Sequence, residues 1–193
     1  TGVLQAGTGD LSIASNLASK ALNVVLGATA ILQSTGANVV FNTVANPGAI
    51  TIAGGNGNIS AGGATPLVTL NGGANAVNVD VNSITGCVGG TGVPFNVQVA
   101  TGLLSAGSIT STGSVVLNNI AGDITFCANC TSTAGSISAT TLASKSINVN
   151  SGVTVQGQTG ISFSTGTLNN DGSIIAVNGT NLIKANTINN NAN

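Results

Sequence analysis

The chain has 193 residues and only seven charged side chains, three Lys and four Asp, which give a net charge of −1. His, Arg, Glu, Met, Trp and Tyr are all absent. Without an imidazole base, a guanidinium group or a basic surface, we expect neither catalysis nor nucleic-acid binding.

Short runs of alternating polar and apolar residues occur along the whole chain. Alternation over four to six residues is typical of a strand with one buried face, and β-branched residues, which favour strands, dominate these runs. We therefore predict strands at residues 50–52, 68–70, 77–81, 95–99, 146–150 and 161–164.

Glycine, asparagine or serine closes each run, and these residue types turn the chain at low steric cost. No segment shows a convincing helical pattern, although residues 17–22 could form a single turn. No run of 18 apolar residues occurs, so we expect no membrane insertion. No change in composition divides the chain, and we predict a single domain over residues 1–193.

Internal repeats indicate the architecture. Residues 17–24 recur as residues 142–149, an offset of 125 residues that corresponds to about six coils of about 21 residues. A looser phrase, Gly followed by a small polar residue and then Ile or Leu, begins at Gly9, Gly57, Gly107, Gly122, Gly135 and Gly172. Short strands with a loose repeat predict an all-β, right-handed parallel β-helix (a β-solenoid) with coils of roughly 20 residues.

The repeated Gly-Ser/Asp/Asn-Ile phrases resemble those of the filamentous-haemagglutinin and autotransporter-passenger class of bacterial surface adhesins. Residues 113–119 and 144–149 carry similar phrases. The resemblance implies secretion, an extracellular or cell-surface location, and a structural or adhesive role. It implies no catalytic residue, because the class has no general catalytic motif to match.

Cys127 and Cys130 form a Cys-x-x-Cys motif, the most specific local feature of the chain. A zinc site would need two more ligands, and a redox pair would need a helix N-terminus that the flanking strands do not provide. We favour a local Cys127–Cys130 disulfide over unpaired thiols, and pairing of either residue with Cys87 is a further alternative. Cys87 lies about two coils before Cys127, about 10 Å along the axis, which is too far for a disulfide unless a loop reaches over. We interpret Cys87 as a small buried residue or, alternatively, as an inter-subunit link.

Four scattered Asp residues argue against the paired carboxylates of a polysaccharide-cleaving enzyme, and we expect no metal or cofactor. The function that we predict is a secreted, non-enzymatic subunit or segment of an extracellular fibre or adhesin, which self-associates into filaments through its open sheet ends. The alternative is a monomeric module that binds a glycan, from a host or a matrix, or another surface through loops near Gly86 to Gly92.

Overall fold

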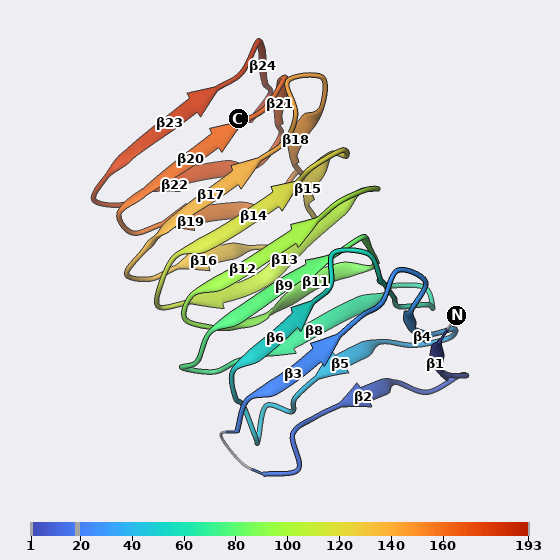
Figure 1. The fold of residues 1–193 in the computed structure, drawn as a ribbon. Helices are drawn as coiled ribbons and strands as arrows, with labels where there is room; N and C mark the ends of the chain where they lie inside the picture. Colours follow the sequence, from blue (N-terminus) through green and yellow to red (C-terminus); the bar gives the residue numbers. More distant parts are fainter. Residues whose placement is uncertain (1, 18–19, 193) are drawn as a thin grey trace.

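The computed structural model describes residues 2–17 and 20–192, and every regular element within them is a β-strand. Parallel strands stack into a β-solenoid with coils of roughly 21 residues, which confirms the predicted fold class. Figure 1 shows the strands as successive rungs, with the two ends of the chain at opposite ends of the stack.

Sheet C contains one strand from each successive coil and runs the length of the stack. Its eight strands, from the N-terminal end, are β3 (Leu22–Val25), β6 (Ile50–Ala53), β9 (Val77–Val81), β12 (Phe95–Val99), β14 (Val115–Asn119), β17 (Ser136–Thr140), β20 (Gly160–Ser164) and β23 (Thr180–Lys184). The strands predicted at residues 50–52, 77–81, 95–99 and 161–164 all lie in this sheet.

Sheet B forms the next side and divides part-way along the stack. Its main path is β2 (Leu11–Ile13), β5 (Val39–Phe41), β8 (Leu67–Asn71), β11 (Cys87–Thr91), β13 (Leu104–Ser111), β15 (Ile124–Phe126), β18 (Ser146–Val149), β21 (Thr167–Asn170) and β24 (Thr187–Asn190). The eight-residue β13 also pairs with a branch made of β16 (Cys130–Ser132), β19 (Thr154–Gly157) and β22 (Ser173–Ala176). The division begins at the corner between β15 and β16.

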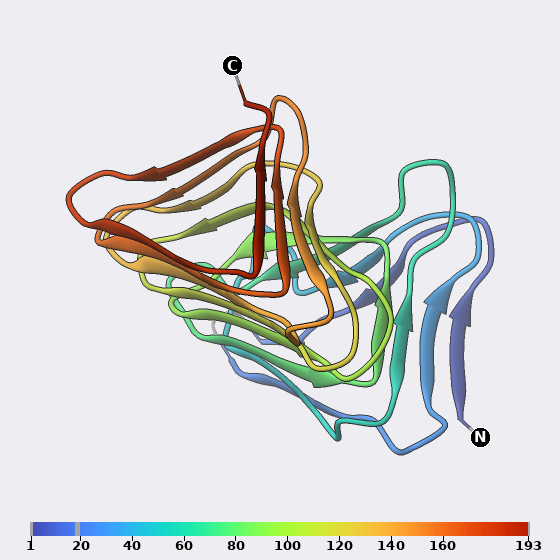
Figure 2. The ribbon, with the colours of Figure 1, turned by 90° about the horizontal axis from the view of Figure 1, so that it is seen from above.

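Sheet A supplies the remaining side of the first coils and then ends. It consists of β1 (Val3–Ala6), β4 (Ile31–Ser34), β7 (Asn58–Ser60) and β10 (Ser83–Thr85). Val3 pairs with Ile31, an offset of 28 residues, whereas Val77 pairs with Phe95, an offset of 18. Seen from above in Figure 2, the later coils overlay as three-sided loops, and the first coils extend to one side of them.

Inward-facing side chains form columns that stack from coil to coil. In one column of sheet C, Val77, Phe95, Val115, Ile137 and Ile161 are paired in register and all are buried. Across the interior, the rings of Phe126 and Phe163 stack with their centroids 5.6 Å apart. Each buried aliphatic side chain of this kind stabilises the fold by about 1.5–3 kcal/mol, so the columns supply the main stabilisation.

Buried serine hydroxyls form hydrogen bonds with backbone groups at three of the corners. Ser111 Oγ donates to the carbonyl oxygen of Gly92 (2.6 Å) and accepts from the backbone N–H of Gly113 (3.0 Å). Ser132 Oγ repeats this arrangement one coil later with Gly113 and Gly135. Ser34 Oγ does the same with the carbonyl oxygen of Gly9 and the N–H of Ala37. Each hydroxyl therefore satisfies backbone groups that turn away from the ladders.

The long repeat does not mark equivalent positions in the stack. Within it, Leu22 lies on β3 of sheet C, whereas Ile147 lies on β18 of sheet B. The column of Leu22 instead reaches Ile137 and then Ile161, at offsets of 115 and 139 residues. The interpretation of 125 residues as six coils is therefore wrong. Residues 18–19 of the repeat, and of the possible helical turn, lie outside the described residues.

The shorter glycine phrase, whose irregular spacing is compatible with coils of roughly 20 residues and loops of varying length, does not recur at equivalent positions of the stack. It precedes or opens strands in all three sheets, for example β7 in sheet A, β15 in sheet B and β17 in sheet C. In each of these the following Ile (Ile59, Ile124 or Ile137) is buried. Five of the six phrases lie at a corner before or at the start of a strand, whereas the one at Gly107 lies inside β13, so the spacing of the phrase does not measure the coil.

Candidate functional site

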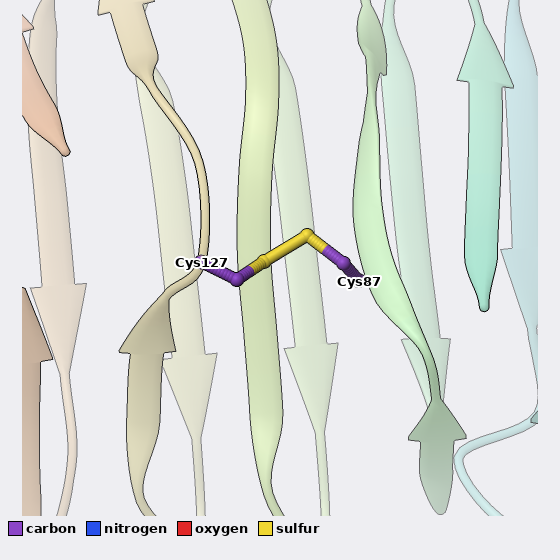
Figure 3. The surroundings of a disulfide bond; sticks show 2 residues. All are labelled: Cys87 and Cys127. Atoms are coloured by element: carbon purple, nitrogen blue, oxygen red, sulfur yellow. A yellow bond between two sulfur atoms is a disulfide. The ribbon is translucent and has the colours of Figure 1, made fainter. Parts of the chain in front are cut away.

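A disulfide bond joins Cys87 to Cys127, 40 residues later, with the two Cα atoms 6.6 Å apart. Cys87 begins β11, and Cys127 lies in the corner after β15. Figure 3 shows the bond passing across the strand that lies between them. By register this strand is β13, because Cys87 pairs with Ser105 and the N–H of Cys127 donates to the carbonyl oxygen of Ala106. The bond therefore connects two coils across a third.

This pairing corrects the predicted Cys127–Cys130 disulfide. Cys130 is free and buried, with its side chain in an inward column between Ile109 and Val155. The side chain of Cys127 points outward from the corner, whereas that of Cys130 points into the interior, so the two sulfur atoms lie on opposite sides of the backbone. The interpretations of Cys87 as a buried residue or as an inter-subunit link are also wrong, because its sulfur is bonded to Cys127 within the chain.

Two glycines explain how the bond spans two coils that were expected to lie too far apart. A Cβ atom on Gly107 would lie 2.3 Å from the backbone nitrogen of Ala128 and 2.7 Å from its Cα. A Cβ on Gly89 would lie 2.5 Å from the carbonyl oxygen of Gly107. The register also shifts between Val88 and Gly90, where β13 carries an extra residue and Ser108 adopts a φ of 54°. With these features the Cα atoms of Cys87 and Cys127 lie 6.6 Å apart, whereas two regular strand spacings would separate them by about 10 Å.

The bond lies where the cross-section of the solenoid changes. Coils before it have the side formed by sheet A, and coils after it have the divided sheet B. Because the disulfide closes a loop of 40 residues, loss of chain entropy in the unfolded state stabilises the fold by about 4 kcal/mol.

A hollow of about 450 Å³ lies beside the disulfide, lined by Thr65, Pro66, Leu67, Gly86, Cys87, Ser105, Ser108, Cys127 and Ala128. The alternative function placed glycan-binding loops near Gly86 to Gly92. The structure corrects this, because β11 occupies Cys87–Thr91 and pairs with strands on both sides. The hollow is thus a depression in the outer face of sheet B.

The four Asp residues share a structural arrangement. Each carboxylate accepts a hydrogen bond from the coil that follows it: Asp10 from Asn38, Asp80 from Gln98, Asp123 from the N–H of Ser146, and Asp171 from Asn191. They lie at separate places along the stack and connect successive coils. Within residues 2–17 and 20–192, no group of three or more His, Cys, Asp or Glu residues is arranged to hold a metal ion.

The end coils leave inward-facing apolar side chains exposed. Leu4 on β1 is 52% exposed, whereas Leu32, its partner one coil further in, is 7% exposed. At the other end, Ile188 on β24 is 54% exposed and its partner Leu168 is 2% exposed. The terminal strands of all three sheets also have one unpaired edge among the described residues. Sequence reasoning predicted the open edges but not which side chains they expose.

No family model, curated protein or solved structure matches the chain. In the part of the chain that the structure describes, no helix is long and apolar enough to cross a membrane.

Proposed function

We propose that the chain is a non-enzymatic structural β-solenoid that assembles end to end into an extracellular or cell-surface filament of the adhesin type. The observation that carries the proposal is the contrast between the end columns and the interior. Leu4 and Ile188 continue columns whose inner members are almost completely buried. A further coil stacked on either end would bury these side chains as it buries the others.

The backbone at the ends supports the same proposal. β1, β2 and β3 at one end, and β22, β23 and β24 at the other, each pair with a strand on one side only. An unpaired strand edge is a template for pairing with another chain. Since all ladders in the stack are parallel, a second copy joined head to tail would extend them in the same direction, and the contact could repeat without closing.

Polar side chains extend the stacking to the last strand. Asn189 on β24 donates from Nδ2 to Oδ1 of Asn169 (2.8 Å), and Asn169 donates in the same way to Asn148 (2.8 Å). Such amide ladders continue readily from one stacked strand to the next. The end of the stack therefore offers an open ladder as well as an open apolar column.

Two further features support a location outside the cell. Disulfides form and persist in oxidising compartments, which include the cell surface and the extracellular space. The glycine phrases resemble those of surface adhesins of the filamentous-haemagglutinin class, in which β-solenoids form fibres. The scarcity of catalytic residue types supports a non-enzymatic role.

Negative-stain electron microscopy of the purified chain over a concentration series tests the proposal. We expect filaments at high concentration that shorten on dilution. Isolated short rods at every concentration would overturn the proposed assembly.

Matched substitutions test whether the end columns form the contact between neighbouring copies of the chain. Leu4→Asn and Ile188→Asn should abolish filaments, because each places a polar group in an apolar column at the junction. Val3→Asn and Leu182→Asn are the controls. Val3 and Leu4 are each 52% exposed, and Leu182 (51%) is nearly as exposed as Ile188 (54%). The two control residues, Val3 and Leu182, face outward from the solenoid. Filaments that resist the first pair, or are lost equally with the second, would contradict assembly through the end columns.

A further inference from the structure

The outer face of sheet C carries a shallow groove of about 380 Å³ over the second to fifth of its strands, counted from the N-terminal end. It crosses β6, β9, β12 and β14, which lie side by side in Figure 1. Its floor is the backbone of the inward-facing residues Ile52, Val79 and Val97, and outward side chains of the neighbouring positions form its walls. Because it crosses the strands, the groove runs along the axis of the solenoid.

Hydrogen-bonded side chains hold the walls in place. On one wall, Asn96 Nδ2 donates to Asn78 Oδ1 (2.8 Å). On the other, Asn118 Nδ2 donates to Gln98 Oε1 (2.8 Å), and Gln98 Nε2 donates to Asp80 Oδ1 (3.1 Å). These contacts fix the orientation of five polar side chains before any ligand arrives. A preorganised site loses less conformational entropy on binding.

The polar and charged groups that line the groove favour an uncharged ligand. Asp80 is its one charged lining residue, and none of the three Lys residues lines it. A polyanion would be repelled by the carboxylate and would find no cation to pair with. Amides and a carboxylate, each able to bond with hydroxyl groups, suit a neutral polyol. The exposed side chain of Val116 and the half-buried side chain of Ala53 offer apolar contact to the C–H faces of sugar rings.

We propose that this groove binds an uncharged polysaccharide laid along the solenoid axis. Neighbouring strands are about 4.8 Å apart, so equivalent polar side chains recur at this spacing along the groove. An extended glycan can therefore meet the same kind of hydrogen-bonding group on successive coils. The groove lies on the side of the stack and includes neither terminal strand of sheet C, β3 or β23, so binding does not depend on filament formation.

The test is binding of the purified chain to an array of neutral gluco-, manno-, xylo- and galacto-oligosaccharides, with heparin and polygalacturonate as anionic probes. The strongest neutral oligosaccharide is then titrated by calorimetry. We expect neutral probes to bind and anionic probes not to bind. No neutral binding across the array, or a preference for the anionic probes, would overturn the proposal.

A pair of variants tests whether the oligosaccharide binds to sheet C. Gln98→Ala removes the side chain that connects Asn118 to Asp80 and should weaken binding at least tenfold. Asn148→Ala is the control, because Asn148 is an equally half-buried, outward amide in the ladder of sheet B, hydrogen-bonded to Asn169. An equal loss in both variants, or no loss with Gln98→Ala, would contradict the assignment. Circular dichroism checks that both variants keep the fold.

Discussion

Gly107 lies in the middle of three closely approaching backbones, between Gly89 on one side and Ala128 on the other. The corner that contains Cys127 and Ala128 rests directly on its Cα, and the disulfide passes beside it. A methyl group there has no room unless the two backbones separate, since the nearest atoms are backbone atoms that cannot rotate away.

We therefore expect Gly107→Ala to move the Cys127 corner outward and to reduce the fraction of protein with the Cys87–Cys127 bond. Mapping of disulfides by mass spectrometry without reduction measures that fraction. Gly27→Ala is the control, because a Cβ at Gly27 would have no atom within 4 Å. Complete disulfide formation in Gly107→Ala would show that the close approach is not required.

Cys130 gives the fold a specific dependence on pH. Burial raises the pKa of its thiol from 9.0 to about 12, because the thiolate would lose its hydration in the apolar interior. The folded chain thus holds the proton more tightly than the unfolded chain. This contribution to stability is complete below pH 9 and is lost as the pH rises toward 12.

Between pH 8.5 and 10.5 we expect the free energy of unfolding to fall by about 2 kcal/mol, at about 1.4 kcal/mol per pH unit above pH 9. Urea denaturation at a series of pH values measures this change. Tyrosine is absent, so few other groups titrate in this range. Cys130→Ala should be less stable at pH 8.5 but should lose the slope; a slope as steep as that of the unmodified chain would refute the explanation.

At the scale of the element, corners rather than strands distinguish one coil from the next. Strands of similar pattern stack in every coil, but the buried hydroxyls of Ser34, Ser111 and Ser132 occur only at certain corners. Each one bonds a carbonyl oxygen of the preceding coil and an N–H of its own turn, and so aligns two coils at the point where the ladder is interrupted.

Ser111→Ala should destabilise the chain by roughly 1–3 kcal/mol, since it leaves the carbonyl of Gly92 and the N–H of Gly113 without their buried partner. The denaturation midpoint in urea measures the loss. Ser138→Ala, a half-buried outward position on β17, is the matched control and should change stability little. Equal effects at both positions would mean that the corner hydrogen bonds contribute nothing specific.

For the whole molecule, stability should vary along the stack. β1 and β24 pair with one neighbour, whereas β12 and β14 are paired on both sides over buried columns. Local opening of a repeat structure begins where fewest contacts must break.

We expect amide hydrogen exchange in dilute protein to be slower in β12 and β14 than in β1 and β24 by roughly tenfold or more. Hydrogen-exchange mass spectrometry resolves these segments. At concentrations that form filaments, β1 and β24 should become as protected as the interior. Equal exchange along the dilute stack would contradict a gradient of stability.

Period-two alternation located four of the eight strands of sheet C, at residues 50–52, 77–81, 95–99 and 161–164, and identified the buried side of each. Residues 95–99 and 161–164 needed no tertiary information, because a strand with one face toward an apolar interior must alternate. The parallel solenoid was predicted from short strands, frequent turns and the loose internal repeats.

The positions of strands relative to one another depended on loop length and could not be read in the same way. The 125-residue repeat joins a strand of sheet C to one of sheet B, because the first coils are longer than the later ones. The alternation of polar and apolar residues predicts which side of a strand faces inward, but it does not predict how many residues each corner contains.

The sequence by itself therefore determined the all-β class, the inward and outward faces of the predicted strands and the stacked architecture, since these follow from local alternation, frequent turns and the loose internal repeats. Only the tertiary structure decided the Cys87–Cys127 pairing, the burial of Cys130, the exposed ends of the apolar columns and the groove on sheet C. Each of these depends on contacts between coils, which are set by the bulge at Gly107 and Ser108 and by the registers of neighbouring strands.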